Sequence, residues 1–280
     1  MDRVSAGRLV VAFSVACGFG LPPDAARGGA LQTAVFTELG GKVWVIERDQ
    51  GARAAVLRAT VGGRSTVKTA DRSRVEMEFA DRSLVRLGSN AIFAFQQATR
   101  EMKLDEGAML LRVPKGVGGV TTVRTAAATA AITGTTVLVS ASKGGGFRMV
   151  VLEGVAEVTY ADGARVRCRS GDMTMRPAGE PGGGTGPSQI HLEGLMGSAG
   201  LVTEFRRELP SLALIRAAIQ LQSERLAAGN LQETGRTFGA STLEPSGDRD
   251  RIRSLTRKTG VDPLKDLRDT RPRDNYTGPK

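Results

Sequence analysis

The sequence predicts a mainly β fold: a stack of short strands, solenoid-like or roll-like, followed by a C-terminal helical extension and a disordered tail. Three observations support this prediction. Short apolar segments alternate with polar residues between Thr33 and Met175. Glycine and aspartate separate these segments at intervals too short for the helical crossovers of a doubly wound parallel sheet. Beyond the linker at residues 179–190, the apolar residues recur at helical spacing.

Residues 1–30 are expected to be a secretory signal peptide. Their apolar run from Leu9 to Leu21 is too short to span a membrane, and the small residues that end at Ala30 suit cleavage there. Two alternatives remain open, namely lipidation at Cys17 and an uncleaved leader that anchors the chain in a membrane. We therefore expect a periplasmic or secreted protein.

Residues 31–178 are predicted to form the β domain. Along Arg74–Phe79 apolar and charged residues alternate, so this strand is expected to turn one face to a core and the charged face, with Glu76, to water. Gly107 and Gly154 are expected between strands, where a positive φ or a tight reversal of the chain is easily reached. The other expected strands are Val43–Ile46, Leu84–Leu87, Ile92–Phe95, Met102–Leu104, Met109–Val113, Val120–Thr125, Thr136–Ser140, Phe147–Leu152, Val155–Tyr160, Arg165–Cys168 and Met173–Met175.

Three segments follow the β domain. Residues 179–190 form a linker rich in glycine and proline, which we expect to be flexible. Residues 191–232 are predicted to be helical, with Pro210 between two helices and Ser211 available as an N-cap. These helices are expected to cover a face or an open end of the β domain; the alternative is a helix pair that binds a partner or oligomerises. Residues 233–280 are expected to be a charged, disordered tail.

The composition argues against an enzyme. The chain has one histidine, His191, and two cysteines, of which only Cys168 remains after the expected cleavage. His191 has no evident orienting partner for general-base chemistry, and metal ligands of suitable type and spacing are lacking. Cys168 is expected to be a small buried hydrophobic residue. We therefore expect no catalytic site, no metal and no cofactor.

The net charge of +10 does not predict nucleic-acid binding. Basic and acidic residues are interleaved along the chain rather than gathered into a stripe that could follow phosphates. Aromatic residues, which stack on bases, make up only 4% of the sequence. We expect no nucleic-acid partner.

Three stretches together resemble a known family. The segment Ser73–Leu84 reads as a strand, an acidic turn and a second strand; Leu104–Val113 reads LDEGAMLLRV; and Ala131–Leu138 reads AITGTTVL, followed by Val151–Val155. In this order and spacing they resemble the FecR domain, a periplasmic β domain first recognised in regulators of iron-siderophore uptake and also found in many secreted bacterial proteins. The resemblance covers roughly Gly41–Arg176.

The resemblance implies a set of residues with structural rather than chemical roles. Gly134 and its neighbours are expected to let the backbone pass closely into the next strand, in a conformation that a Cβ would block. The family usually has Asp-Gly-Ser where this chain has Asp81-Arg82-Ser83, so this turn must form without glycine. The full set is Asp81, Ser83, Gly107, Gly134, Thr135, Glu153 and Gly154.

The function expected from this resemblance is a non-enzymatic, exported module that binds a partner or relays a signal in the bacterial cell envelope. An envelope protein is the expected partner, with an acidic cell-wall polymer as a second. Only eight residues precede Leu9, so we do not expect the cytoplasmic anti-sigma segment of the family's regulators. The alternative is a module for cell-wall glycan or a small ligand, with a platform of Trp44, Tyr160 and Phe93.

Overall fold

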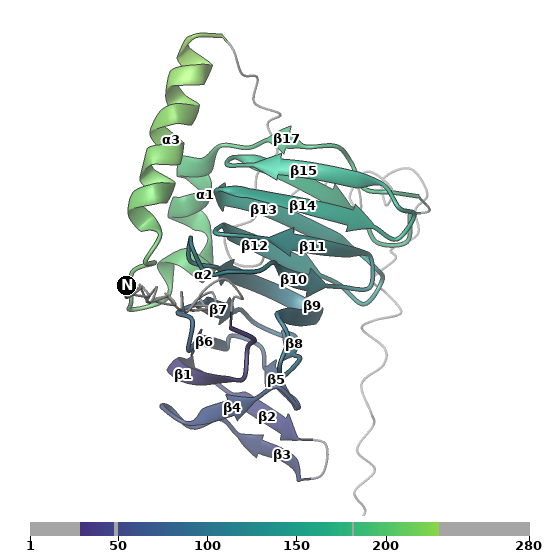
Figure 1. Ribbon diagram of the computed structural model, residues 1–280, viewed down its shortest axis with the longest axis vertical. Coiled ribbons are helices and arrows are strands. Elements are labelled where there is room, and N and C mark those ends of the chain that lie inside the picture. Colours follow the sequence, from purple (N-terminus) through teal and green to yellow (C-terminus); the bar gives the residue numbers. More distant parts are fainter. Residues whose placement is uncertain (1–28, 48–49, 181, 230–280) are drawn as a thin grey trace, which may run out of the picture.

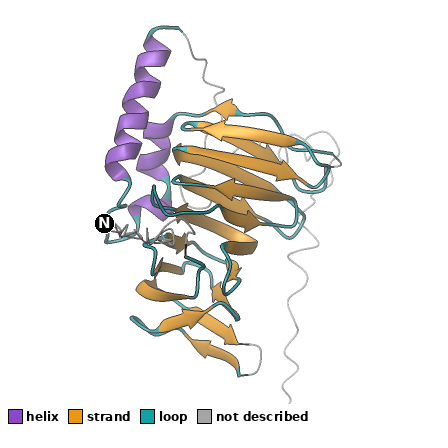
Figure 2. Ribbon diagram, viewed as in Figure 1, coloured by secondary structure: helices purple, strands orange, loops and turns teal. Residues whose placement is uncertain are grey.

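The computed structural model describes residues 29–47, 50–180 and 182–229, and strands make up most of it (Figure 1, Figure 2). The stack of short strands predicted from the sequence is confirmed. The alternative at Cys17 and the expected tail lie outside the described residues, as does the expected signal peptide except for its last two residues, Gly29 and Ala30.

Seventeen strands and three helices follow one another along the described residues. The strands are β1 (Thr33–Gly40), β2 (Val43–Glu47), β3 (Gly51–Ala54), β4 (Thr60–Gly62), β5 (Ser65–Thr69), β6 (Arg74–Phe79), β7 (Leu84–Leu87), β8 (Ile92–Phe95), β9 (Glu101–Arg112), β10 (Thr121–Arg124), β11 (Ala128–Ile132), β12 (Thr136–Ala141), β13 (Phe147–Glu153), β14 (Val155–Tyr160), β15 (Arg165–Arg169), β16 (Asp172–Arg176) and β17 (Ser188–Gln189). The helices are α1 (Leu192–Ser198), α2 (Gly200–Thr203) and α3 (Leu212–Ala227).

The strands form two open sheets that share β9. Sheet I has the order β4-β1-β6-β7-β9-β12-β13-β16-β17, and sheet II has the order β3-β2-β5-β8-β9-β10-β11-β14-β15. Every named pair is antiparallel except β9 with β10. The result is a roll of antiparallel strands, in which hairpins such as β6–β7, β12–β13 and β14–β15 connect neighbouring strands.

The long strand β9 corrects the sequence-based division of this region. Met102–Leu104 and Met109–Val113 were expected to be separate strands divided at Gly107, but β9 continues through Gly107 from sheet II into sheet I. Gly107 has a positive φ of +91°, as expected, yet it bends one strand instead of ending it. A bend without reversal is how a single strand serves both sheets.

The main core lies between the two sheets. It takes alternate residues from each strand, among them Phe36, Met77 and Val151 from sheet I and Phe93 and Leu104 from sheet II. All five side chains are fully buried. This packing of two inner faces explains the period-two alternation in the sequence.

A second core lies on the outer face of sheet I, beneath the helices. Leu110, Leu138 and Leu152 point away from the main core and pack with Leu195 and Ile215. Figure 1 shows α1, α2 and α3 along one side of the strand stack, as expected for a covering helical extension. The central strands β7 and β13 of sheet I are therefore buried on both faces, whereas the helices leave the outer face of sheet II uncovered.

The helical extension is divided near Pro210, as predicted, but two short helices, α1 and α2, precede the proline where one helix was expected. Pro210 lies between α2 and α3, and Ser211 stands at the N-cap position of α3. The Ser211 hydroxyl, however, makes no capping hydrogen bond. It lies 2.8 Å from the Thr136 hydroxyl instead, so this residue joins the helix to β12.

The linker at residues 179–190 packs against the β domain over its described residues. The Thr185 amide donates to the Met175 carbonyl at 2.8 Å, and the Thr185 carbonyl accepts from the Thr174 hydroxyl at 2.6 Å. A Cβ at Gly184 would lie 1.9 Å from the Tyr160 ring. The glycine here permits a close approach to the stack, which is a different role from the flexibility expected of the segment.

Candidate functional site

The turn after β6 contains the first two motif residues, Asp81 and Ser83. Asp81 Oδ1 accepts the Ser83 amide at 2.8 Å, and Oδ2 accepts the Ser83 hydroxyl at 2.9 Å. Arg82 takes the position where the family has glycine, with a φ of +62°. The hydrogen bonds from Ser83 to Asp81 hold Arg82 in the left-handed region, so the turn forms without a glycine.

Arg100 connects the same turn to β10 and also contacts Gly29, a residue that the expected cleavage at Ala30 would remove. Its Nη2 lies 2.7 Å from Asp81 Oδ2, its Nε donates to the Thr121 hydroxyl at 3.1 Å, and its Nη1 donates to the Gly29 carbonyl at 3.0 Å. Arg100 and Asp81 are largely buried, so each compensates the charge of the other. Asp81 and Ser83 thus act in the architecture of the turn.

Gly134, Thr135 and Gly154 meet where β11 passes into β12. The Thr135 hydroxyl lies 2.8 Å from the carbonyls of both Thr133 and Val155, and it accepts the Val155 amide at 3.3 Å. A Cβ at Gly154 would lie 2.8 Å from this hydroxyl. The expected close passage of backbones occurs here, around a buried threonine.

Replacing Gly134 by valine is expected to lower the free energy of unfolding. Gly134 has a φ of +59°, and an added Cβ would lie 3.0 Å from Lys115 Cγ and 3.2 Å from Lys115 Cα. Crowding of this kind costs about 1–3 kcal/mol. Chemical denaturation measures the change, with Gly116→Val as the control, because Gly116 also has a positive φ but faces open space. Equal losses in the two variants would contradict the packing explanation.

Glu153 is a buried carboxylate beneath the helices. Its Oε1 lies 2.9 Å from the Thr136 hydroxyl, which contacts Ser211 in turn. Because Thr136 has one proton, donation to the carboxylate requires Ser211 to donate to Thr136. Burial raises the pKa of Glu153 from its ordinary value, while the Thr136 hydrogen bond and the charge of Lys115 oppose the shift.

The variant Glu153→Gln is expected to be more stable than the parent at neutral pH, and this advantage should shrink on acidification. A raised pKa means that the folded state holds the proton more tightly than the unfolded chain. The stabilising contribution of Glu153 is therefore complete below the ordinary glutamate pKa and is lost as the pH rises through the folded-state pKa. Urea denaturation from pH 4 to pH 8 tests the difference, with exposed Glu157→Gln as the control. A difference independent of pH would contradict the assignment.

An additional buried cluster, which the sequence did not reveal, fastens the helical extension to sheet I. Arg86 and Glu76 are fully buried and lie 2.8 Å apart. This corrects the expectation that Glu76 faces water, because α2 and the residues after it cover that face of β6. Alternation along a strand fixes which side a residue faces but not what lies on that side.

Arg86 makes further contacts with the helical extension. Its Nη1 donates to the Leu201 carbonyl at 3.1 Å, its Nη2 donates to the Arg207 carbonyl, and its guanidinium lies 4.5 Å from the centroid of the Phe205 ring. Burial lowers the pKa of Arg86, and the hydrogen bond to Glu76 opposes the shift. We call Arg86, Glu76 and Phe205 the Arg86 cluster. Its donors are used within the protein, which indicates a structural role.

The outer face of sheet II is a strand surface that the helices leave uncovered. Neighbouring residues form a row across it, in the order Ile46, Thr66, Ala94, Lys103, Arg124, Thr129, Thr159 and Arg165. All of these side chains are exposed or half-buried. Arg124 pairs with Glu101 at 2.8 Å and Lys103 with Asp105 at 2.9 Å. Sheet II therefore presents a mixed polar outer face that no described helix covers.

The aromatic platform expected for a glycan-binding module does not form. Phe93 is fully buried in the main core, and Tyr160 is 2% exposed and packs edge-on against Phe147. Of the three candidates only Trp44 is partly exposed.

Cys168 is buried, as expected, and burial raises the pKa of its thiol to about 12. His191 is the N-cap of α1 and accepts the Gly194 amide at 3.0 Å.

A shallow pocket of about 460 Å³ opens near the start of β1. Polar side chains line it, and the lining residues are Gln32, Gly63, Arg64, Gln96, Gln97 and Ala98. Within the described residues, no three or more histidine, cysteine or acidic side chains come together as metal ligands, and none of the helices is long and apolar enough to cross a membrane.

Comparison with known proteins supports the resemblance read from the sequence. Residues 65–157 match the model of the FecR protein family, a shorter range than the Gly41–Arg176 inferred from motifs. This range contains all seven motif residues and runs from β5 into β14. No curated protein sequence matches the chain. Two crystal structures of a candidate anti-sigma factor from Parabacteroides distasonis align over 70% of this chain and 92% of their own, at 13% and 14% identity and a TM-score of 0.43.

Proposed function

We propose that this chain, which carries a FecR match over residues 65–157, is an exported, non-enzymatic module that binds a protein partner and relays a signal in the bacterial cell envelope. The observation that carries the proposal is the unequal use of the two sheets. The central strands β7 and β13 of sheet I are buried on both faces, while sheet II keeps its outer face exposed. A rigid sheet with one open face is a suitable recognition surface.

Export is part of the same proposal. The apolar run Leu9–Leu21 and the small residues before Leu31 suit a secretory leader, which would deliver the β domain to the periplasm or the medium. Cell fractionation tests this, with cleavage at Ala30 measured by mass spectrometry of the exported chain. Recovery of the uncleaved chain in the cytoplasm would contradict it.

Site-specific photocrosslinking in living cells tests partner binding. A photoreactive amino acid placed at Lys68, Thr129 or Thr159 on the outer face of sheet II should crosslink to one and the same envelope protein. The same amino acid at Gln220, on the exposed side of α3, is the control. The proposal fails if sheet II gives no specific crosslink, or if Gln220 gives the same product.

A small-ligand function has one structural observation in its favour, the polar pocket near β1. Arg64 and three glutamine side chains there could bind a carboxylated or hydroxylated ligand. A thermal-shift screen with peptidoglycan fragments and oligosaccharides tests this function, with Arg64→Ala as the pocket variant. A ligand that stabilises the parent but not the variant would favour it over protein binding.

A further inference from the structure

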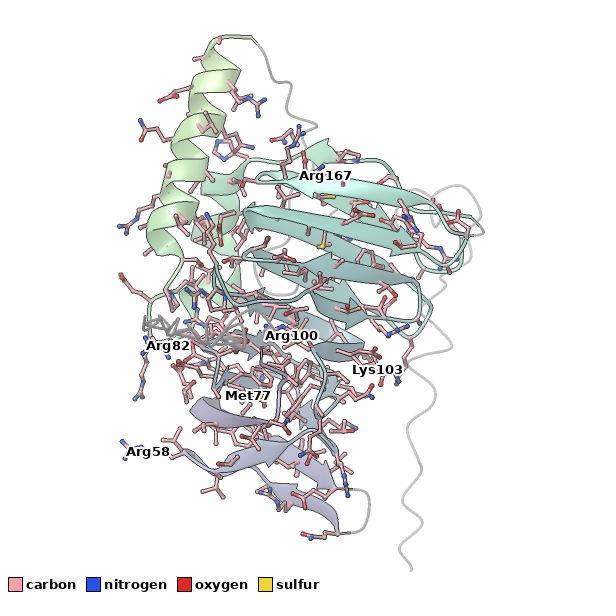
Figure 3. The ribbon with its side chains drawn as sticks, viewed as in Figure 1. Arg58, Met77, Arg82, Arg100, Lys103 and Arg167 are labelled. Carbon is pink, nitrogen blue, oxygen red and sulfur yellow. The ribbon has the colours of Figure 1, made fainter. Side chains whose placement is uncertain are left out.

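The strand β15 lies at the open edge of sheet II. It pairs with β14 along one side, and no other described strand pairs with it. Figure 1 shows it at the end of the stack opposite β3, and Figure 3 shows Arg167 on this strand. An unpaired edge can accept a further strand through its backbone groups.

The backbone groups of β15 that face away from β14 can be identified. The Arg169 amide donates to Asp172 Oδ2 at 2.7 Å, so it points away from β14. Groups two residues apart along a strand point the same way, and those of Arg165 and Arg167 therefore point outward as well. A free stretch remains at these two residues, and the contact of Arg169 with Asp172 closes one end of it.

The side chains of the same strand make a charged row. Arg165, Arg167 and Arg169 are exposed on the outer face of sheet II, while Cys168 is buried between them on the inner face. None of the three arginines forms an ion pair with an acidic residue in the part of the chain that the structure describes. Glu157 is the cross-strand neighbour of Arg167 but makes no ion pair with it.

We propose that the β15 edge binds an extended, acidic segment of a partner protein, which adds to sheet II as an antiparallel strand. This inference rests on the proposed function and names its binding surface. Residues of the added strand opposite Arg165 and Arg167 lie about 5 Å away and are selected for carboxylates, as is the residue at the closed end of the stretch, beside the Arg169 side chain. The residues between them face the half-buried Val166 and the buried Cys168 and are selected for apolar side chains.

A second copy of this chain does not meet these requirements at either edge of sheet II. Two β15 edges would bring like-charged arginines into opposition, which is unfavourable. The opposite edge, β3, consists of Gly51–Ala54 and offers Arg53 instead of a carboxylate. The charge row thus disfavours self-association while leaving the edge open to an acidic strand.

Fluorescence anisotropy with a labelled Thr-Glu-Val-Glu-Val-Glu-Thr peptide and the full chain purified from the cell envelope tests the proposal. We expect saturable binding, weakened at least tenfold by the double variant Arg165→Glu, Arg167→Glu. The matched double variant Arg216→Glu, Arg225→Glu changes the same charge on exposed α3 positions and should alter binding less than twofold. Circular dichroism and melting curves establish that both variants are folded.

Backbone methylation separates strand pairing from simple charge attraction. N-methylation of the central glutamate replaces an amide hydrogen that faces β15 and should weaken binding at least tenfold. N-methylation of a valine, whose amide hydrogen faces away from β15, should change binding less than twofold. The proposal is overturned if no saturable binding occurs, or if the two methylated peptides bind equally. It is also overturned if a scrambled peptide, Thr-Glu-Glu-Glu-Val-Val-Thr, binds as tightly as the original peptide. If the crosslinks from Lys68, Thr129 and Thr159 still appear, the proposed function stands without this edge.

Discussion

The variant Arg86→Ala is expected to lose about 3–5 kcal/mol of unfolding free energy, because it leaves the buried Glu76 carboxylate without its compensating charge. Glu76 is 1% exposed, and the Arg86 side chain is fully buried. Three carbonyls at residues 201, 202 and 207 also lose their donor. The loss should therefore be concentrated at the joint between sheet I and the helical extension.

Two measurements together test this expectation. Urea denaturation gives the loss in stability, and hydrogen exchange should show faster exchange in α2 and the start of α3 than in β13. The control is Arg53→Ala, which removes an exposed pair with Glu47 at 2.8 Å and should cost at most about 1 kcal/mol. A loss in Arg86→Ala no greater than in the control would contradict the role assigned to the Arg86 cluster.

The variant Gly107→Ala is expected to be as damaging, although it adds a single methyl group. The new Cβ would lie 2.5 Å from Ala91 Cα and 2.9 Å from the Ala91 amide nitrogen, both backbone atoms that cannot rotate away. The φ of +91° adds strain for any residue with a Cβ. Crowding and strain together should cost about 3–5 kcal/mol, measured by denaturation.

Gly163→Ala separates these two contributions. Gly163 has nearly the same φ, +87°, but an added Cβ there meets no atom within 4 Å. This variant should lose only the strain, about 1–2 kcal/mol. If the two variants lost equal unfolding free energy, the crowding of the new Cβ against Ala91 would contribute nothing to the loss in Gly107→Ala.

Period-two alternation predicted the central strands well but failed where side chains are small or the polar pattern is irregular. The strand β11 was not predicted, because Ala128, Ala130 and Thr129 offer little contrast between its two faces. The strands β1, β3, β4 and β5 were also missed. In each, pairing with neighbours supplies the hydrogen bonds that define the strand, and such pairing leaves little trace in a short local sequence.

The candidate sites show a similar division. Glycine at position 134 predicted a positive φ, which is a local backbone property, and the structure has it. The Arg86 cluster could not be predicted from local sequence patterns, because Arg86 and Leu201 are 115 residues apart. A signal for burial did exist in the unbroken apolar run Met149–Leu152, which suits a strand covered on both faces.

The sequence by itself determined the strand-rich stack, the positive φ at Gly107, Gly134 and Gly154, and a helical segment divided near Pro210, because each follows from residue type and short-range periodicity. Only the tertiary structure decided which sheet the helices cover. Covering sheet I converts Glu76 from a surface residue into a buried partner of Arg86 and leaves sheet II exposed. Burial depends on contacts between distant segments, which a local pattern does not encode.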